Sequence, residues 1–382
     1  MLGWEFPPAI TGGLGVHCFE LVSSLANLGV DVDLYLPKQK AAPQSPHSRV
    51  RIIEVGGGQK VGAYGHAFGA AGNGNYSRDL IAAIDEFAHL SSAALRASGT
   101  RYDLVHCHDW LTIPAGLMAR DALKLPLVLT MHSTEYDRNP FPWSWISDIE
   151  ALGVKSADLS IAVSNKMKGM LMEKFGADGG RVRVIYNGID ISKYKKGNHA
   201  PGREKLVLFL GRLAHQKGPE QFLLAAKKVL KHDSSVRFLV VGEGGMLPRL
   251  ISLSIELGIA DRVSFWGFVP EEEKRSIYSL CSAYVMPSVS EPFGISALEA
   301  MASGTPCILS KNSGVREVAR NCLLVDFWDV DEMASQILAI LRYPCLSRVM
   351  SANEIQDAAR LGWQETARQT LGVYNEVLRK AK

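Results

Sequence analysis

The sequence predicts an α/β protein made of two doubly wound, Rossmann-like domains, each with a parallel sheet. Short runs rich in leucine and β-branched residues alternate with longer amphipathic runs, which is the pattern of repeated βα units. The 382 residues are enough for about two domains of ordinary size. A polar segment rich in helix-breaking residues, 195–202, lies near mid-chain and is typical of an interdomain linker.

The expected elements follow this alternation along the chain. In the first half, strands are predicted at 30–36, 102–106, 127–131, 159–163 and 182–185. In the second half they are predicted at 206–210, 236–241, 262–265, 283–286 and 306–309. A helix over 15–28 is expected to bury one stripe, and another over 219–231 opens with Pro219 in its first turn. The residues predicted on the stripe of the first helix are Val16, Phe19, Val22, Leu25 and Leu28.

This pattern divides the chain into three parts. Residues 1–197 are predicted to form a first domain and 198–345 a second, with helices over 346–382 crossing back to the first domain. Ligands of open α/β sheets bind beyond the carboxyl ends of the strands, so the site is expected in the crevice between the domains. The glycine-rich segment 56–75 is interpreted as a surface loop, with an acceptor-site flap as the alternative.

Composition excludes several classes of protein. The chain is 47% hydrophobic and 21% charged, and its net charge of +3 is too balanced to favour nucleic-acid binding. No apolar run reaches the ~18 residues of a membrane span, and the first residues lack the pattern of a signal peptide. Six scattered cysteines without a C-x-x-C pair favour reduced thiols and a cytoplasmic location. A peripheral membrane contact stays open, as does the oligomeric state.

Residues 290–300 contain the most informative pattern. Glu291 and Glu299 stand eight positions apart, the first in a Pro-Phe-Gly loop and the second about one turn inside a helix. Both carboxylates can therefore face one cleft at the helix N-terminus, where unbonded backbone N–H groups favour an anion. Carboxylates accept hydrogen bonds from hydroxyls, and the amides donate to phosphates. A nucleotide sugar has both kinds of group.

Three strand-to-helix turns of the second half add charges and glycines. Arg212 and Lys217 follow Gly211 and can converge on a diphosphate; the alternative is two solvated surface cations. Gly242 and Glu243 form a second turn of the same kind, which is weak evidence by itself. The third turn places Trp266 and Phe268 where they could flank a base, although Trp266 fits a core position equally well.

The first half offers a less specific set of candidates. Gly12 and Gly13 precede the first helix and can present N–H groups to a phosphate. Neighbouring residues of the run 106–110 point to opposite faces of a strand, so they cannot all bind one metal ion, and Asp109 is the better candidate for a sugar hydroxyl or the acceptor. His132 and Glu135 are expected to be exposed to the crevice, with a core histidine as the alternative.

Two D-x-D triplets also occur in the chain. This triplet is typical of metal-dependent sugar transferases. The triplets at 31–33 and 329–331 lie away from the expected carboxyl ends of strands, so both are interpreted as solvated element starts.

Together these motifs resemble a known family. The Glu-x7-Glu pair with Glu-Pro-Phe-Gly, the Gly-Arg…Lys-Gly loop, the run Tyr-Asn-Gly-Ile-Asp at 186–190 and the Gly-Gly-x-Gly start resemble the retaining GT-B glycosyltransferases, above all family 4 and the glycogen and starch synthases. The elements at 108–110 and 132–135 look most like archaeal and bacterial members of the glycogen synthase type. The resemblance covers nearly the whole chain and implies two Rossmann-like domains facing a cleft. It implies that the domain at 1–197 binds the acceptor and that the domain at 198–345 binds the nucleotide sugar.

The resemblance also implies roles for individual residues. Arg212 and Lys217 would neutralise the diphosphate, Glu299 would bind the ribose, and Glu291 would bind the sugar 3- and 4-hydroxyls. His132 would contact the sugar 6-hydroxyl, with Asp109 near the transferred sugar and the acceptor. The implied catalytic residues are His132, Glu291, Arg212, Lys217 and Asp109, and Glu135 joins Asp109 at the acceptor. The implied donor-binding residues are Gly12, Gly13, Gly211, Arg212, Lys217, Gly242, Glu243, Phe268, Phe293, Gly294, Ile295 and Glu299.

The expected activity is transfer of a hexose, glucose before others, from a nucleoside diphosphate sugar to a glycan, without a metal or another cofactor. In retaining members the departing phosphate is thought to take the acceptor proton, so no hydrolase-like carboxylate pair is needed. The alternatives are a mannosyl- or glucosyltransferase with a lipid or small-molecule acceptor, a nucleotide-sugar epimerase of the same fold, and a binding protein without activity. The nucleotide (ADP, UDP or GDP) stays open.

The chain departs from the family pattern at three points. Thr11 precedes the glycine cluster where bacterial glycogen synthases have a Lys-x-Gly-Gly-Leu-Gly loop, and the chain is shorter than those enzymes. Both differences weigh against elongation of long glucans. Family members also begin a few residues earlier, so we expect the first strand to be cut before Leu2.

Overall fold

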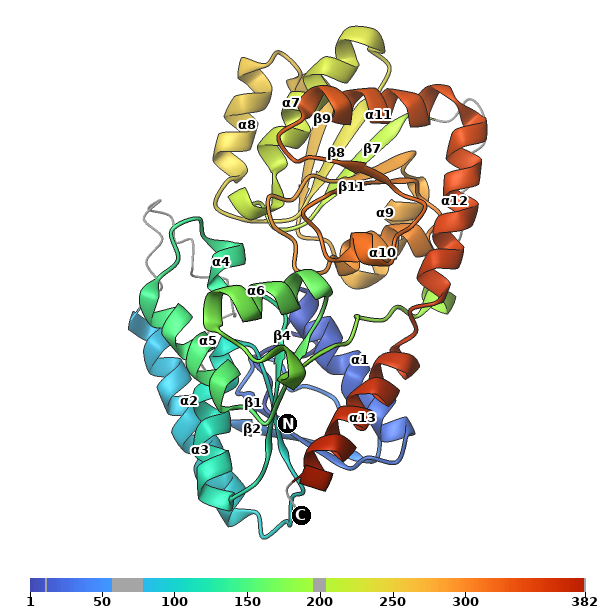
Figure 1. Cartoon of the computed structure of the whole chain (residues 1–382). Helices are drawn as coiled ribbons and strands as arrows, with labels where there is room; N and C mark the ends of the chain where they lie inside the picture. The colour runs from blue at the N-terminus through green and yellow to red at the C-terminus, as the bar shows by residue number, and fades with distance from the viewer. Residues whose placement is uncertain (11, 57–77, 195–203, 381–382) are drawn as a thin grey trace. The chain divides into compact units, whose positions relative to one another are not determined.

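The computed structural model describes residues 1–10, 12–56, 78–194 and 204–380. The chain divides into two compact units (Figure 1). Met1–Gly188 and Trp363–Lys382 form the first unit, and Ile189–Gly362 form the second. The predicted linker at 195–202 and nearly all of the glycine-rich segment 56–75 lie outside the described residues.

The first unit contains a parallel sheet in the order β3-β4-β5-β6 and a parallel pair, β1-β2. The four-stranded sheet consists of β3 (Val105–His108), β4 (Leu127–Met131), β5 (Leu159–Ala162) and β6 (Val182–Val184). The pair consists of β1 (Val32–Pro37) and β2 (Val50–Val55). Leu2 forms parallel bridges to Tyr35 of β1 and Cys107 of β3, so the first residues of the chain join the two parts.

Helices cover both faces of this unit (Figure 1). On one side α1 (Gly13–Asn27) packs against α13 (Trp363–Lys380). On the other side α2 (Arg78–Ala97) packs against α3 (Ile113–Leu123), and α3 packs against α5 (Ser144–Ser156). The remaining helices of the unit are the short α4 (Glu135–Arg138) and α6 (Asn165–Phe175).

The apolar face of α1 differs from the predicted stripe. Val22 and Leu25 are buried as expected, but Val16, Phe19 and Leu28 are only half-buried. The helix contacts both β1 and α13, so it buries a wider face than a helix on an open sheet. The additional buried side chains of this helix are Leu14, His17, Cys18, Leu21, Ser24 and Ala26.

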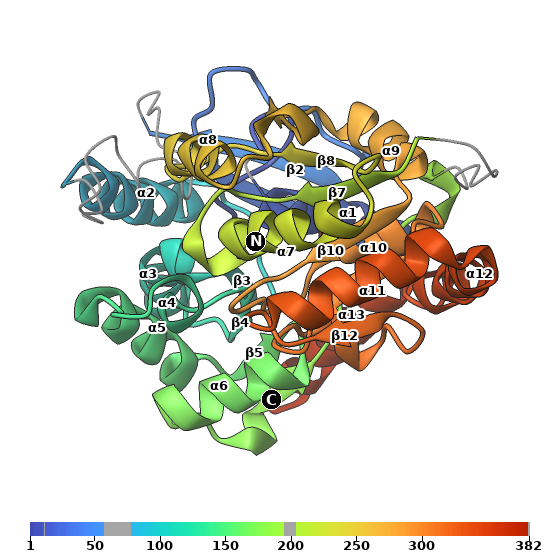
Figure 2. The same ribbon diagram turned by 90° about the horizontal axis from the view of Figure 1, so that it is seen from above.

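The second unit has a six-stranded parallel sheet in the order β12-β11-β10-β7-β8-β9. Its strands are β7 (Leu206–Leu210), β8 (Arg237–Val241), β9 (Val263–Gly267), β10 (Ala283–Met286), β11 (Cys307–Ser310) and β12 (Leu323–Val325). The direction of winding reverses between β7 and β10, which is the topological switch point of a doubly wound fold. Figure 2 shows the helices of this unit on both faces of the sheet.

The helices of the second unit are α7 (Pro219–His232), α8 (Leu247–Glu256), α9 (Glu271–Leu280), α10 (Ile295–Ala302), α11 (Val330–Arg342) and α12 (Pro344–Ala359). Pro219 occupies the first turn of α7, as predicted. Of the two C-terminal helices, α12 packs on α10 and α11 within this unit, whereas α13 belongs to the first unit. The ends of the second unit are joined where the Ile189 N–H donates to the Leu361 carbonyl at 2.6 Å.

Among the described residues, ten strands occur close to their predicted positions, and two were missed. Arg51 and Glu54 interrupt the apolar residues of β2, and β12 is only three residues long, so neither forms the long apolar run of a buried parallel strand. None of the helices in the parts of the chain that the structure describes combines the length and the apolar character needed to span a bilayer.

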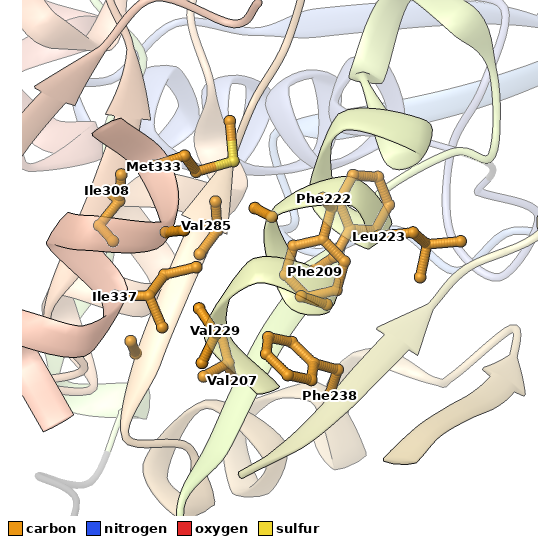
Figure 3. Close-up of a cluster of buried hydrophobic side chains, with 14 of the residues drawn as sticks. Val207, Phe209, Phe222, Leu223, Val229, Phe238, Val285, Ile308, Met333 and Ile337 are labelled. Atoms are coloured by element: carbon orange, nitrogen blue, oxygen red, sulfur yellow. The ribbon is translucent and has the colours of Figure 1, made fainter. Parts of the chain in front are cut away.

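The core of the second unit lies between the central strands and helices α7 and α11 (Figure 3). Phe209 of β7 lies 5.7 Å from Phe222 of α7, measured between ring centroids, and Phe222 lies 5.7 Å from Phe238 of β8. These three rings are joined on the α11 side by Met333 and Ile337. Close packing in this core fixes the positions of the strands, whose ends carry the loops of the candidate site described below.

Truncation of Phe222 to alanine tests this core. Phe222 is fully buried, so Phe222→Ala should lower the free energy of unfolding of the second unit by about 3–5 kcal/mol, measured by urea denaturation. Phe268→Ala is the matched control, because Phe268 is 60% exposed, and it should change stability by less than about 1 kcal/mol. Equal losses of stability in both variants would contradict the assignment of Phe222 to this core.

Candidate active site

Most predicted residues of the second half lie at one edge of its sheet. The loops after β7, β8, β9 and β10 all leave the carboxyl ends of parallel strands, so they gather at that edge. The loop after β7 includes Arg212 and Lys217, and the loop after β10 includes Glu291. Because β7 and β10 are neighbours in the sheet, these two loops lie side by side.

Lys217 and Glu291 form an ion pair in this arrangement. The Lys217 Nζ lies 2.6 Å from Oε2 of Glu291, which is 7% exposed. The two loops are also joined by the backbone, since the Val289 N–H donates to the Gln216 carbonyl at 2.8 Å. The Gln216 side chain in turn donates to the Ser290 carbonyl at 3.1 Å. The position of the pair is therefore fixed by backbone as well as by charge.

Two glycines make this packing possible. Gly218 has φ +70°, and a Cβ there would lie 2.0 Å from the Pro287 carbonyl oxygen. Gly242 has φ +132°, and a Cβ there would lie 2.0 Å from the Gly211 carbonyl oxygen. No other residue fits either place without moving the backbone. These contacts keep the turns after β7, β8 and β10 in close register.

The turn after β8 packs on the loop that contains Arg212. The Leu213 N–H donates to the Glu243 carbonyl at 2.8 Å, while the Glu243 side chain is exposed and the Arg212 side chain is half-buried. Trp266, near the end of β9, is 55% exposed, and Phe268, just after the strand, is 60% exposed. The question left open by the sequence for Trp266 is thus resolved in favour of the surface.

The N-terminus of α10 follows Glu291 directly. Gly294 is its N-cap with φ +119°, and it supplies no side-chain cap. The first backbone N–H groups of a helix have no partner within the helix, so this end can receive an anion at Gly294 and Ile295. The preceding loop is held because Phe293 is buried and its carbonyl accepts from the Val315 N–H at 2.8 Å.

Glu299 lies one turn inside α10 and is held by α9. Its Oε2 accepts a hydrogen bond from the Tyr278 hydroxyl at 2.8 Å. Burial raises the pKa of Glu299 to about 7, although the nearby Lys274 opposes the shift. Lys274 also pairs with Glu271 at 2.6 Å. Sequence reasoning missed these partners, although the spacing of Lys274 and Tyr278, four positions apart on a helix, places them on one face.

In the first unit, three imidazoles gather at the carboxyl ends of β3 and β4. His108 ends β3, His132 follows β4, and His17 lies on α1. The His108 Nδ1 lies 3.1 Å from the His132 Nε2, and the centroids of the His17 and His132 rings are 4.3 Å apart. Burial lowers the pKa of all three, that of His132 to about 3, so they are neutral at physiological pH.

Two nitrogens of this cluster offer unused hydrogen-bonding capacity. His17 bonds through Nδ1 to the Asn187 side-chain oxygen at 2.7 Å. The Nε2 atoms of His17 and His108 are buried and have no hydrogen-bond partner among the described residues. Such atoms can bond sugar hydroxyls. Nitrogens of His17, His108 and His132 also lie within 4.8 Å of one another, so the cluster could hold a metal ion.

The cluster refines the interpretation of the run 106–110. His108 of this run joins the cluster, while His106 bonds Tyr374 and Thr130 through its two ring nitrogens, at 2.6 and 2.7 Å. The absence of a metal requirement stays a prediction. Sequence reasoning missed His17, because it lies within an apolar helical stretch and no spacing links it to His108 or His132.

Asp109 lies directly beneath His132. It is fully buried with φ +59°, and its Oδ1 accepts from the backbone N–H groups of His132 at 2.5 Å and Ser133 at 3.3 Å. The carboxylate therefore fixes the loop that presents His132. Its predicted proximity to the sugar and the acceptor stays a prediction.

The expectation that Glu135 is exposed was wrong. Glu135 is fully buried, and its Oε2 pairs with Arg138 at 3.1 Å. Arg138 also pairs with the buried Glu150 at 2.7 Å, and Glu150 accepts the backbone N–H of Glu135. A short helix that begins at Glu135 turns this side chain inward toward the arginine. An acceptor-binding role for Glu135 remains a prediction.

The other predicted elements have local partners. Gly12 is the N-cap of α1 without a side-chain cap, and Gly13 is the first helical residue. Asp31 pairs with Arg49 at 2.9 Å, and Asp33 pairs with Arg51. Asp329 caps α11 by accepting the Glu332 N–H at 2.9 Å. Both D-x-D triplets thus have structural partners.

Comparison with known proteins identifies the family. The family model of Glycosyltransferase Family 4 matches residues 11–193, and that of Glycosyl transferases group 1 matches residues 190–357. An uncharacterized glycosyltransferase of Methanocaldococcus jannaschii is 30% identical, over 98% of this chain and 97% of the relative. The chain belongs to the family 4 glycosyltransferases. It is thus an enzyme that transfers glycosyl groups.

Other relatives of this glycosyltransferase differ in their named activities. A glycogen synthase of Mycobacterium tuberculosis is 29% identical, over 98% of this chain and 93% of the relative. A D-inositol 3-phosphate glycosyltransferase of Nocardia farcinica is 30% identical, over 96% of this chain and 85% of the relative. The family is therefore shown, whereas the acceptor differs between relatives of nearly equal similarity.

Solved structures show that the glycosyltransferase has the GT-B fold with two Rossmann-like domains. Sucrose-phosphate synthase from Thermosynechococcus elongatus superposes with a TM-score of 0.82 at 24% identity, covering 99% of this chain and 96% of the other. Anabaena HepE in complex with UDP-glucose superposes with a TM-score of 0.72 at 18% identity, covering 98% and 99%. At these sequence identities the structural similarity supports the fold and not a shared activity.

The raised pKa of Glu299 predicts a pH-dependent stability. As pH rises, the unfolded chain releases this proton near its ordinary value and the folded chain only near about 7, so stability falls across that window. Glu299→Gln removes the titration. Between about pH 5 and about pH 8, the free energy of unfolding should therefore shift in favour of the variant by up to about 3 kcal/mol.

Urea denaturation at both pH values measures this difference in protein without ligands. Glu256→Gln is the control, because the Glu256 side chain is 56% exposed, and it should follow the wild type. Parallel pH profiles for wild type and Glu299→Gln would contradict the raised pKa.

Proposed function

We propose that this protein is a retaining glycosyltransferase that moves a hexose, with glucose as the first candidate, from a nucleoside diphosphate sugar to a glycan. The single observation that carries the proposal is the Lys217–Glu291 ion pair beside the uncapped N-terminus of α10. A cation, a hydroxyl-binding carboxylate and an anion-binding helix end then lie within one loop system. This combination suits a ligand that joins a sugar to a diphosphate.

In this proposal the two residues of the ion pair bind different parts of the donor. Lys217 and Arg212 take the charge of the diphosphate, which grows as the bond to the sugar breaks. Glu291 accepts hydrogen bonds from the sugar hydroxyls, assisted by the amides at the start of α10. Glu299, held by Tyr278, accepts from the ribose hydroxyls. The acceptor hydroxyl attacks the anomeric carbon on the face from which the diphosphate leaves, and the departing phosphate takes the acceptor proton, so the anomeric configuration is retained.

The first unit supplies neutral hydrogen-bonding groups in this proposal. His132 donates to or accepts from a hydroxyl of the transferred sugar, and Asp109 holds the His132 loop through backbone N–H groups. Because burial keeps the imidazoles uncharged, they interact with hydroxyls rather than with the diphosphate. Charge compensation is then assigned to Arg212 and Lys217, with no metal ion in the reaction.

The relatives support glucose and a glycan acceptor, and they also favour one alternative. A glycogen synthase and a HepE structure with UDP-glucose support the first proposal. The alternative is a small-molecule acceptor, supported by relatives named D-inositol 3-phosphate glycosyltransferase at similar identity. The two proposals share the donor site and differ in the acceptor.

A transfer assay with labelled UDP-glucose, ADP-glucose and GDP-mannose, each with a glucan or an inositol phosphate, tests both proposals. Lys217→Ala and Glu291→Ala should each lower kcat/KM on the order of 100-fold or more, because each removes a group that stabilises the transferring charge or sugar. Lys311→Ala is the matched control, since Lys311 pairs with Asp326 at 2.8 Å and its side chain is 50% exposed. Unchanged turnover in both site variants would overturn the site assignment.

The stereochemistry of the product tests the retaining mechanism. With an α-linked nucleotide sugar as donor, the product measured by NMR should carry an α-linkage. A β-linked product would show inversion.

Chelation tests the assignment of charge compensation to Arg212 and Lys217. EDTA should leave the initial rate of transfer largely intact, because no metal acts on the diphosphate. Complete loss of transfer that manganese restores would contradict this prediction.

A further inference from the structure

Two cysteines and a glutamate meet at the edge of the second unit's sheet that is opposite the candidate site. Cys307 begins β11, and Cys322 immediately precedes β12. The two strands are parallel, with Ile308 opposite Leu323, so the cysteines stand at the same level of neighbouring strands. Their side chains therefore point to the same face of the sheet. Cys307 is fully buried and Cys322 is half-buried.

Glu354 of α12 completes the cluster. It is fully buried, and its Oε1 accepts the backbone N–H of Cys307 at 3.1 Å. Its Oε2 is also buried and has no hydrogen-bond partner among the residues that the structure describes. A buried carboxylate oxygen without a donor is costly, since the water that it loses is not replaced.

The three groups are close enough to share one ion. The Sγ atoms of Cys307 and Cys322 and a carboxylate oxygen of Glu354 all lie within 4.8 Å of one another. In a tetrahedral zinc site with Zn–S bonds of about 2.3 Å, two sulfur ligands lie roughly 3.8 Å apart. Small rotations of these side chains are sufficient to reach that geometry.

The backbone around the cluster is already fixed by α12. Asp357, one turn after Glu354, accepts hydrogen bonds from the backbone N–H groups of Arg320 at 2.9 Å and Asn321 at 3.1 Å. It also accepts from the Asn321 side chain at 2.8 Å. The helix thus holds both the loop before Cys322 and the start of β11. Such support orients ligands before an ion binds.

We infer that Cys307, Cys322 and Glu354 form a binding site for a thiophilic divalent cation, with Zn²⁺ as the physiological candidate. Two thiolates and one carboxylate are a zinc-type donor set, and the half-buried Cys322 side leaves the fourth position to water. Binding releases the two thiol protons and the proton of the Glu354 carboxyl to solvent as two S–metal bonds and one O–metal bond form. The ion gives the unpaired Glu354 oxygen a partner and links β11, β12 and α12. Its role is structural, and it lies apart from the residues proposed for transfer.

Cadmium titration of the reduced, metal-free full-length protein tests the site. Cd²⁺ bound to thiolates gives an ultraviolet charge-transfer band, which nitrogen ligands in the histidine cluster do not produce. We expect one Cd²⁺ per chain with this band, and a rise in Tm on addition of Cd²⁺ or Zn²⁺, because a ligand of the folded state stabilises it. Cys322→Ser and Glu354→Gln should each weaken binding by more than about tenfold.

Cys345→Ser is the matched control, because Cys345 is exposed and lies outside the cluster, and it should bind Cd²⁺ like the wild type. Glu354→Gln keeps an oxygen for the Cys307 N–H, so it separates loss of a ligand from loss of folding. Binding that is unchanged in Cys322→Ser, or a Cys307–Cys322 disulfide without any bound cation in protein isolated without reductant, would overturn the inference. Lys217→Ala and Glu291→Ala should bind Cd²⁺ normally, so this result is independent of the proposed transfer activity.

Discussion

The adjacency of β7 and β10 in the second unit's sheet is the constraint on which the donor half of the candidate site depends. These parallel strands bring the loops at 211–218 and 287–294 together at the switch point, where the Gln216–Val289 backbone bond joins them. The Lys217–Glu291 pair forms only because the two loops are joined there. Gly218 and Gly242 permit the approach, since a Cβ at either position would meet a carbonyl oxygen. An ion pair, a backbone hydrogen bond and two glycines therefore act together where these loops meet.

Burial of ionisable groups favours their neutral forms in both units. In the first unit it keeps the imidazoles of His108 and His132 neutral, which leaves them suited to hydroxyls. In the second unit it raises the pKa of Glu299, which has the Tyr278 hydroxyl as a hydrogen-bond donor. Burial likewise raises the pKa of Glu354 at the opposite edge of the sheet, where two thiols are its neighbours. The same physical cost therefore occurs at the candidate active site and at the inferred metal site.

Family membership explains why the fold agrees with that of the relatives. It does not identify the acceptor, because the fold does not determine which acceptor binds. Relatives named for glycogen synthesis and for inositol phosphate transfer are almost equally similar to this chain. One fold hosts many acceptors because the strands that define the fold are shared, whereas the loops that follow them differ between proteins.

The sequence by itself determined the alternation of strands and helices, the parallel α/β class and the donor motifs, because these depend on short-range periodicity and fixed spacing. The pair Glu291 and Glu299 and the glycines at strand ends are features of that kind. Only the tertiary structure brought His17 to His108 and His132, turned Glu135 inward to Arg138, and placed Cys307, Cys322 and Glu354 together. These residues are far apart in the chain, and no local pattern encodes their contact. Their proximity is set by strand order and helix packing, which are decided by the fold as a whole.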